Sequence, residues 1–163
     1  MTSKRDVAST LGKEYEMRNT GCAQSTIAAI FDSLGIWSES VFRAGTGLAD
    51  GLGLTGDGSC GALVGASMVI SYLFPREREN FGDMFRAMKA YRLVKELHDE
   101  YVREFGSCRC QDVQKKLMGR SFNLWDPKEF NEAVNSNMME YCSNVVAWTA
   151  GKAVEIIELH REK

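Results

Sequence analysis

The sequence contains only two prolines, Pro75 and Pro127, among its 163 residues. Because proline interrupts helices, long helices can form between these positions. The chain also lacks an apolar run near the roughly 18 residues that a membrane span needs. Its first residues, Met1 to Asp6, contain no apolar stretch of the signal-peptide kind. We therefore expect no membrane span and a cytoplasmic location.

An excess of charge of either sign is missing as well. Lysine and arginine number 20 against 22 aspartates and glutamates, so the net charge is -2. No strongly basic face is available to bind a phosphate backbone, which argues against nucleic acid as a partner. A chain of this length fits one compact domain, which we expect to span residues 1–163.

Neither strand patterns nor internal repeats are found, whereas apolar residues three or four apart are frequent. This spacing predicts helices over residues 6–18, 22–34, 60–74, 83–105, 110–118, 127–134 and 137–157, with a short helical turn at 38–43. The predicted fold class is all-α, a compact bundle of about five to seven helices. The charged ends, 4–18 and 155–163, are interpreted as solvated surface. The helices over 63–74 and 83–105 carry more apolar surface than one short bundle can bury, so we expect a homodimer.

Eight of the fifteen glycines lie between residues 45 and 65, and they predict a long loop that ends at Ser59. Gly-x-Gly-x-x-Gly occurs twice there, but no strand precedes it, so a dinucleotide site is disfavoured. Backbone N–H groups of Gly56, Gly58 and Gly61 can instead approach an anionic cofactor or a substrate carboxylate, because no Cβ intervenes. A flexible surface loop is the alternative interpretation.

The five cysteines are an odd number, which fits poorly with a closed set of disulfides. Four of them, Cys22, Cys60, Cys110 and Cys142, fall near the first turns of four different predicted helices. The positive end of a helix favours a thiolate, so we expect lowered thiol pKa values. Four converging thiolates would hold an iron–sulfur cluster or a zinc ion. The alternative is that each is an ordinary small buried residue.

The cysteine spacing contains no Cys-x-x-Cys motif, and Cys108 and Cys110 are the only close pair. A metal site must therefore be assembled by the tertiary structure. The chain has only two histidines, His98 and His160, and this scarcity argues against a Cys–His hydrolytic dyad.

Several stretches, taken in order, resemble the family of redox-active proteins called C_GCAxxC: Gly21-Cys22-Ala23-Gln24, the glycine-rich loop, Cys60-Gly61-Ala62-Leu63-Val64-Gly65, Phe105-Gly106-Ser107 before Cys110, and Cys142 ahead of a C-terminal helix. The resemblance covers residues 19–158. It implies a helical domain, related to the cluster-bearing part of split-Soret cytochromes, that binds a [2Fe–2S] centre and is often dimeric. Thr26 stands where the pattern of that name has a second cysteine. Cys108 is additional to the four cysteines of the resemblance, and it would act either as a substitute ligand or as a resolving thiol.

The first hypothesis is a small redox protein with Cys22, Cys60, Cys110 and Cys142 as iron–sulfur ligands. It would act in electron transfer or redox sensing, with a redox protein or a small molecule as electron donor or acceptor. Such a protein is an electron carrier or redox accessory protein rather than a hydrolase or transferase. The alternatives are a metal-free thiol/disulfide oxidoreductase, which would use Cys108 with Cys110 or Cys60 with a partner cysteine, and a module that binds a small anion.

Overall fold

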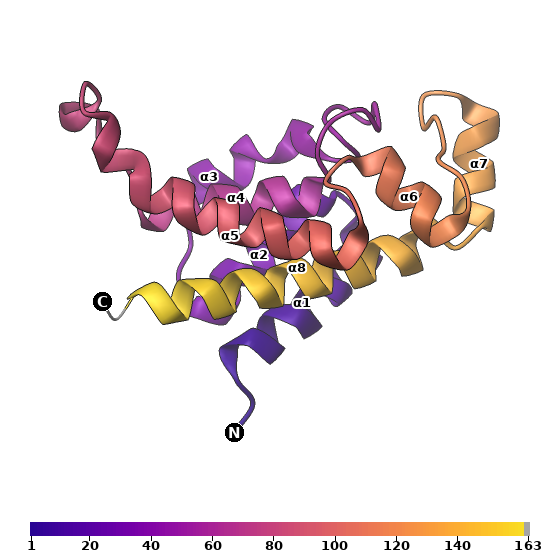
Figure 1. Ribbon diagram of the computed structural model, residues 1–163. Helices are drawn as coiled ribbons and strands as arrows, with labels where there is room; N and C mark the ends of the chain where they lie inside the picture. The colour runs from indigo at the N-terminus through magenta and orange to yellow at the C-terminus, as the bar shows by residue number, and fades with distance from the viewer. Residues whose placement is uncertain (162–163) are drawn as a thin grey trace.

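The computed structural model describes residues 1–161, which fold into helices without any named β-strand (Figure 1). The α-helices are α1 (Lys4–Asn19), α2 (Cys22–Leu34), α3 (Glu39–Ala44), α4 (Gly61–Leu73), α5 (Met88–Phe105), α6 (Cys110–Met118), α7 (Pro127–Asn135) and α8 (Met138–Arg161). Short 3-10 helices are η1 (Thr46–Leu48), η2 (Arg78–Asn80) and η3 (Met84–Ala87). The all-α prediction is confirmed, and the eight helices of the described part include the six-residue α3.

Local capping explains several helix ends. The Ser3 side chain accepts a hydrogen bond from the Asp6 N–H at 3.1 Å and begins α1. Asp126 accepts from Lys128 at 2.8 Å and begins α7, with Pro127 in its first turn. Gly106 ends α5 in the left-handed region, at φ +83°.

The long helix expected over residues 83–105 is shorter in the structure. Asp83 caps the 3-10 turn η3, accepting a hydrogen bond from the Phe85 N–H at 2.9 Å. The α-helical geometry starts only at Met88. An early aspartate cap thus produces a tight turn before α5, which the apolar spacing alone does not distinguish from a helix.

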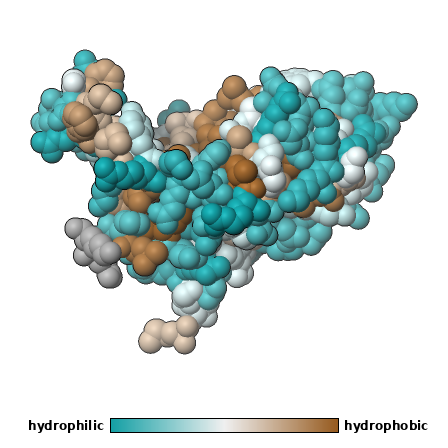
Figure 2. Space-filling model, viewed as in Figure 1, coloured by the Kyte–Doolittle hydropathy of each residue, from teal (hydrophilic) through white to brown (hydrophobic). Residues whose placement is uncertain are grey.

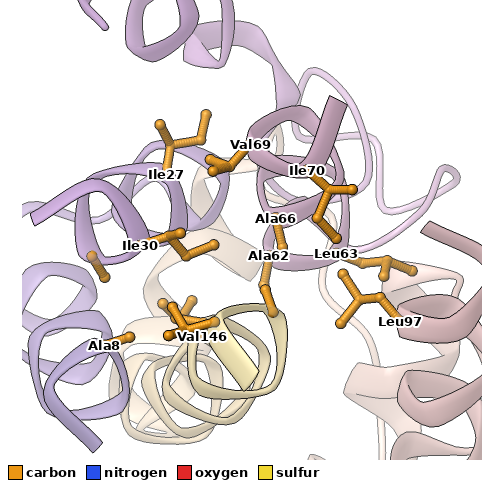
Figure 3. Packing of buried hydrophobic residues seen from close by; sticks show 14 of the residues in the cluster. Ala8, Ile27, Ile30, Ala62, Leu63, Ala66, Val69, Ile70, Leu97 and Val146 are labelled. Carbon is orange, nitrogen blue, oxygen red and sulfur yellow. The ribbon is translucent and has the colours of Figure 1, made fainter. Parts of the chain in front are cut away.

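The core lies where α1, α2, α4 and α8 pack together, with α5 against α4 (Figures 1 and 3). Figure 3 shows branched side chains of α2 and α4 facing small ones: Ile27, Ile30, Ala62, Ala66 and Val69, all fully buried. A smaller cluster joins α6, α7 and the beginning of α8 around Phe122, Ala133 and Met138. Cys60 belongs to the large cluster and Cys22 packs against it, whereas Cys142 packs against the smaller cluster.

Helices α2 and α4 approach each other closely at Gly65. A Cβ there would lie 3.0 Å from the Ala23 Cα and would overlap the Ala23 carbonyl oxygen. Only glycine permits this contact, because backbone atoms cannot move aside as a flexible side chain can.

None of the helices within residues 1–161 combines the length and the apolar character that crossing a membrane requires.

We predict that Gly65→Ala lowers the free energy of unfolding by about 1–3 kcal/mol, because the new methyl forces α2 and α4 apart. Gly82→Ala is the matched control: its Cβ would meet no atom within 4 Å, so its unfolding midpoint should stay near that of the wild type. Urea unfolding followed by circular dichroism measures both. Equal midpoints for the two variants would contradict the contact.

Candidate functional site

Four of the five cysteines line a single cavity of about 330 Å³: Cys22, Cys60, Cys110 and Cys142. Cys22 and Cys110 are the first residues of α2 and α6, and Cys60 immediately precedes α4. Cys142 lies one turn inside α8. The structure thus brings together the four cysteines singled out from their helical placement. Cys108 does not line the cavity.

Backbone hydrogen bonds join the glycine-rich loop to the segment before α6. The Cys60 N–H donates to the Cys108 carbonyl at 2.8 Å, and the Cys110 N–H donates to the Gly58 carbonyl at 2.9 Å. An ion pair between Arg109 and Asp57 adds to this join. Backbone hydrogen bonds therefore hold Cys60 and Cys110, fifty residues apart in the chain, close to each other.

Two glycines are required for the close approach of these segments to the cysteines. A Cβ at Gly61 would overlap the Cys22 sulfur and lie 2.9 Å from the Leu48 carbonyl oxygen. A Cβ at Gly51, whose φ is +70°, would lie 2.8 Å from the Cys110 Cβ. Glycine at these positions allows α4 and the loop to pack directly against two cavity cysteines.

The N–H groups of Gly56 and Gly58, expected to face an anionic group, donate within the loop. Their acceptors are the carbonyls of Asp50 and Gly51, each at 2.8 Å. These glycines shape the loop around the cavity. Contact of Gly56, Gly58 or Gly61 with a cofactor stays a prediction.

Asp50 connects two of the cysteines and was missed by the sequence reasoning. Its Oδ1 accepts hydrogen bonds from the Cys110 thiol at 3.1 Å and from Gln114 Nε2 at 2.7 Å. Its backbone N–H donates to the Cys22 sulfur at 3.5 Å. Oδ2 is buried and has no hydrogen-bond partner in residues 1–161. An aspartate followed by a glycine is typical of exposed turns, so the sequence carried no signal for the burial of Asp50.

Glu16 is a second buried carboxyl beside the cavity, and its side chain corrects the expectation of a solvated surface over residues 4–18. It is 3% exposed, and its Oε2 has no hydrogen-bond partner among the described residues. The reason is that α1 packs lengthwise between α2 and α8, which cover its last turns. Burial raises the pKa values of both Glu16 and Asp50.

The four cavity thiols have raised pKa values, contrary to the lowered values expected at helix N-termini. Removal from water is the main cause for Cys22, Cys60, Cys110 and Cys142. The Tyr101 hydroxyl and the N–H groups of Ala62 and Leu63 favour the Cys60 thiolate, but by less than burial disfavours it. Charge on neighbouring thiols raises the pKa values further, so the metal-free site is uncharged at its sulfurs near neutral pH.

The rest of the cavity wall is mainly apolar, and much of it comes from α6, α7 and α8, including Leu117, Phe130, Val134 and Val145. No lysine, arginine or histidine is among its lining residues, so His98 and His160 stand apart from it. In residues 1–161, no group of three or more histidine, cysteine, aspartate or glutamate side chains is arranged to hold one metal ion. The site is thus a set of spaced thiols rather than a tight single-ion cage.

The sequence matches a family model over residues 20–156, with the description "Putative redox-active protein (C_GCAxxG_C_C)". This range covers most of the chain and contains all five cysteines. The chain belongs to this family. No curated protein and no solved structure gives a significant match.

The family description also bears on Thr26. The stretch GCAxxG in that description ends in glycine rather than cysteine, so the family pattern requires no cysteine ligand at the position of Thr26. Thr26 is fully buried, and its hydroxyl donates to the Cys22 carbonyl at 2.7 Å inside α2. The description writes four cysteines, and the cavity contains four.

We predict that the cavity thiols of the metal-free, folded protein react with iodoacetamide at pH 8 more than about tenfold slower than in the denatured chain. The reason is that each unit of raised pKa reduces the thiolate fraction about tenfold, and burial hinders access as well. Mass spectrometry of the separate cysteine peptides gives the four rates. If a cavity cysteine reacts as fast in the folded protein as in the denatured chain, its thiol does not have the raised pKa and the restricted access described above.

We predict that Glu16→Gln stabilises the metal-free protein near neutral pH. A carboxyl whose pKa is raised by folding contributes most below its unfolded pKa, near 4, and that stability is lost as the pH rises through the folded pKa. The glutamine variant should therefore melt higher at pH 7, by about 2–4 °C for each kcal/mol gained, and show little advantage at pH 4.

The control for this pH dependence is Glu14→Gln, an exposed position on the same helix. It should show no gain at pH 7. Thermal melts of both variants across this pH range test the prediction, and a Glu16→Gln gain that does not depend on pH would contradict it.

Proposed function

We propose that this protein is a small redox protein in which Cys22, Cys60, Cys110 and Cys142 hold an iron–sulfur cluster of the [2Fe–2S] type. It would serve electron transfer or redox sensing. The observation that carries the proposal is the convergence of four thiols, at or near the beginnings of four separate helices, on one cavity. Membership of a family described as redox-active supports it.

The donor set fits a cluster better than a zinc ion. With Zn–S bonds of about 2.3 Å, tetrahedral zinc needs its four sulfurs about 3.8 Å apart. Within the described part of the chain no three side chains meet the requirement of a single ion. A two-iron cluster divides four thiolates between two irons, so that only pairs of sulfurs need to converge. Among the described residues no three such side chains meet at one point, and the second arrangement does not require them to.

The raised pKa values of the metal-free thiols are compatible with a role as metal ligands. Each thiol must lose its proton to become a ligand, so that metal binding replaces an unfavourable buried charge with a bond to a cation. Asp50 Oδ1, which accepts from the Cys110 thiol, is a nearby acceptor for a departing proton. Gln114 Nε2, 3.1 Å from the Cys110 sulfur, can then donate to the thiolate.

When bound, the cluster would supply one-electron oxidation and reduction. The chain would tune it through hydrogen bonds to sulfur, which raise a cluster's potential. The Asp50 N–H donates to Cys22, and the Ala62 and Leu63 N–H groups point toward Cys60. The apolar walls from α6, α7 and α8 would exclude water. Electrons would pass to a redox protein or to a small-molecule donor or acceptor.

The two alternative functions have less support. A metal-free thiol oxidoreductase needs accessible thiolates, whereas burial raises the pKa of every cavity thiol. Cys108 and Cys110 do not share the cavity, because only Cys110 lines it. A small anion would face two buried carboxyls and no lining cation.

We predict that anaerobically purified protein is brown and contains about two iron and two sulfide per chain. Cys60→Ser should lose most of this iron, because a serine hydroxyl is a poor ligand for iron and leaves one anchor missing. Cys108→Ser should keep it, since Cys108 does not line the cavity. Iron and sulfide analysis with absorption spectra makes the comparison.

Equal iron content in the two cysteine variants would refute the ligand assignment of Cys60. A wild-type protein that remains colourless after reconstitution with iron and sulfide under anaerobic conditions would refute the cluster and favour the thiol oxidoreductase.

A further inference from the structure

Tyr101 brings the only polar side-chain atom into the buried face of α5. The other buried residues of this helix are Ala90, Leu93, Leu97 and Phe105. The opposite face of α5 is exposed, and hydrophilic groups predominate over the middle of the bundle, which this helix crosses (Figures 1 and 2). Tyr101 itself has no solvent exposure. A phenylalanine would fill nearly the same space, so packing alone does not account for the hydroxyl.

Aromatic neighbours hold the Tyr101 ring in place. Its centroid lies 4.7 Å from that of Phe105 on the same helix and 6.2 Å from that of Trp148 on α8, which it meets edge to face. The Phe105 and Trp148 rings also contact each other, with their centroids 5.2 Å apart. Packing of this kind restricts the side chain to one orientation, so the hydroxyl has a defined position in the core.

The Tyr101 hydroxyl lies beside the Cys60 sulfur, and both residues belong to the large core cluster. Burial raises the pKa of Tyr101 well above its ordinary value, and charge on Cys60, Cys110 and Cys22 raises it further. Among these three cysteines, Cys60 acts on the hydroxyl most strongly. The phenol therefore stays protonated, and it can only donate its proton in a hydrogen bond toward the cysteine site.

This hydroxyl has no hydrogen-bond partner within residues 1–161. The other buried side-chain atoms without a partner there are carboxyl oxygens, so Tyr101 supplies the one hydroxyl among them. An unpaired buried polar group is costly and indicates a partner that is present in another state of the protein. A protonated thiol is a weak acceptor, whereas a thiolate is a strong one. Cys60 becomes a good acceptor when a metal replaces its proton.

We propose that Tyr101 is a positioning residue of the redox centre: its hydroxyl donates a hydrogen bond to the Cys60 sulfur when Cys60 is a ligand, and this bond raises the reduction potential of the cluster. The inference rests on the proposed function, because it assumes that Cys60 binds the cluster. A reduced cluster carries one more electron than an oxidised one. A donor to its ligand sulfur therefore stabilises the reduced form more.

Tyr101→Phe removes the hydroxyl and keeps the ring, so the iron content should equal that of the wild type. The cluster potential should shift to a more negative value, because the reduced form loses its hydrogen bond. Tyr91→Phe is the matched control: it is the same substitution on the same helix, at a residue that is 54% exposed and does not line the cavity. Its potential should equal that of the wild type. Redox titration followed by absorption gives the three potentials.

The contact with Cys60 can be measured without a cluster. In metal-free, folded Tyr101→Phe protein, Cys60 should react with iodoacetamide about three- to tenfold slower than in the wild type, because one hydrogen bond to its thiolate is lost. The rate at Cys142 should not change, since Tyr101 does not contribute to the pKa shift of that thiol. Mass spectrometry of the cysteine peptides measures both rates, with Tyr91→Phe again as the control.

The outcomes separate this inference from the proposed function. A wild-type protein that takes up no cluster would refute the proposed function, and the Cys60 reaction rates would then decide on the contact alone. A wild-type protein with a cluster, together with an unchanged potential in Tyr101→Phe, would overturn the role of Tyr101 only. An equal shift in Tyr91→Phe, or a Cys60 rate unaffected by Tyr101→Phe, would overturn it as well.

Discussion

The direct contact of α4 with α2, without intervening side chains, is the constraint on which the rest of the structure depends. At Gly65 the two backbones meet, and at Gly61 the start of α4 reaches the Cys22 sulfur. One helix pair therefore supplies both the centre of the core and two of the four cavity cysteines. Because core and site share this contact, a change that loosens the packing also displaces thiols.

The site combines features that are unfavourable without a ligand. Four thiols and two carboxyls line one mainly apolar cavity, and Glu16 Oε2 and Asp50 Oδ2 have no hydrogen-bond partner among the described residues. Burial raises the pKa of all of these groups, which favours their uncharged forms and limits the cost. A buried cation cluster would reverse this balance, because it replaces the protons and gives the ligand thiolates a partner. Stability and cofactor content are expected to be linked for this reason.

Much of the helical architecture could be predicted from the sequence, because apolar spacing and caps such as Asp126 act over only a few residues. The same local rules brought Cys22, Cys60, Cys110 and Cys142 to helix ends, and the motif around Gly61 indicated the family. The two buried carboxyls could not be found in this way. Glu16 is buried only because α2 and α8 cover α1, and Asp50 only because a loop residue meets Cys110, sixty residues later. The thiol pKa values depend on the same tertiary burial, which outweighs the helix dipole that the sequence suggested. Local hydrogen bonding and periodicity are thus encoded in short stretches of sequence, whereas desolvation is decided by which distant segments exclude water.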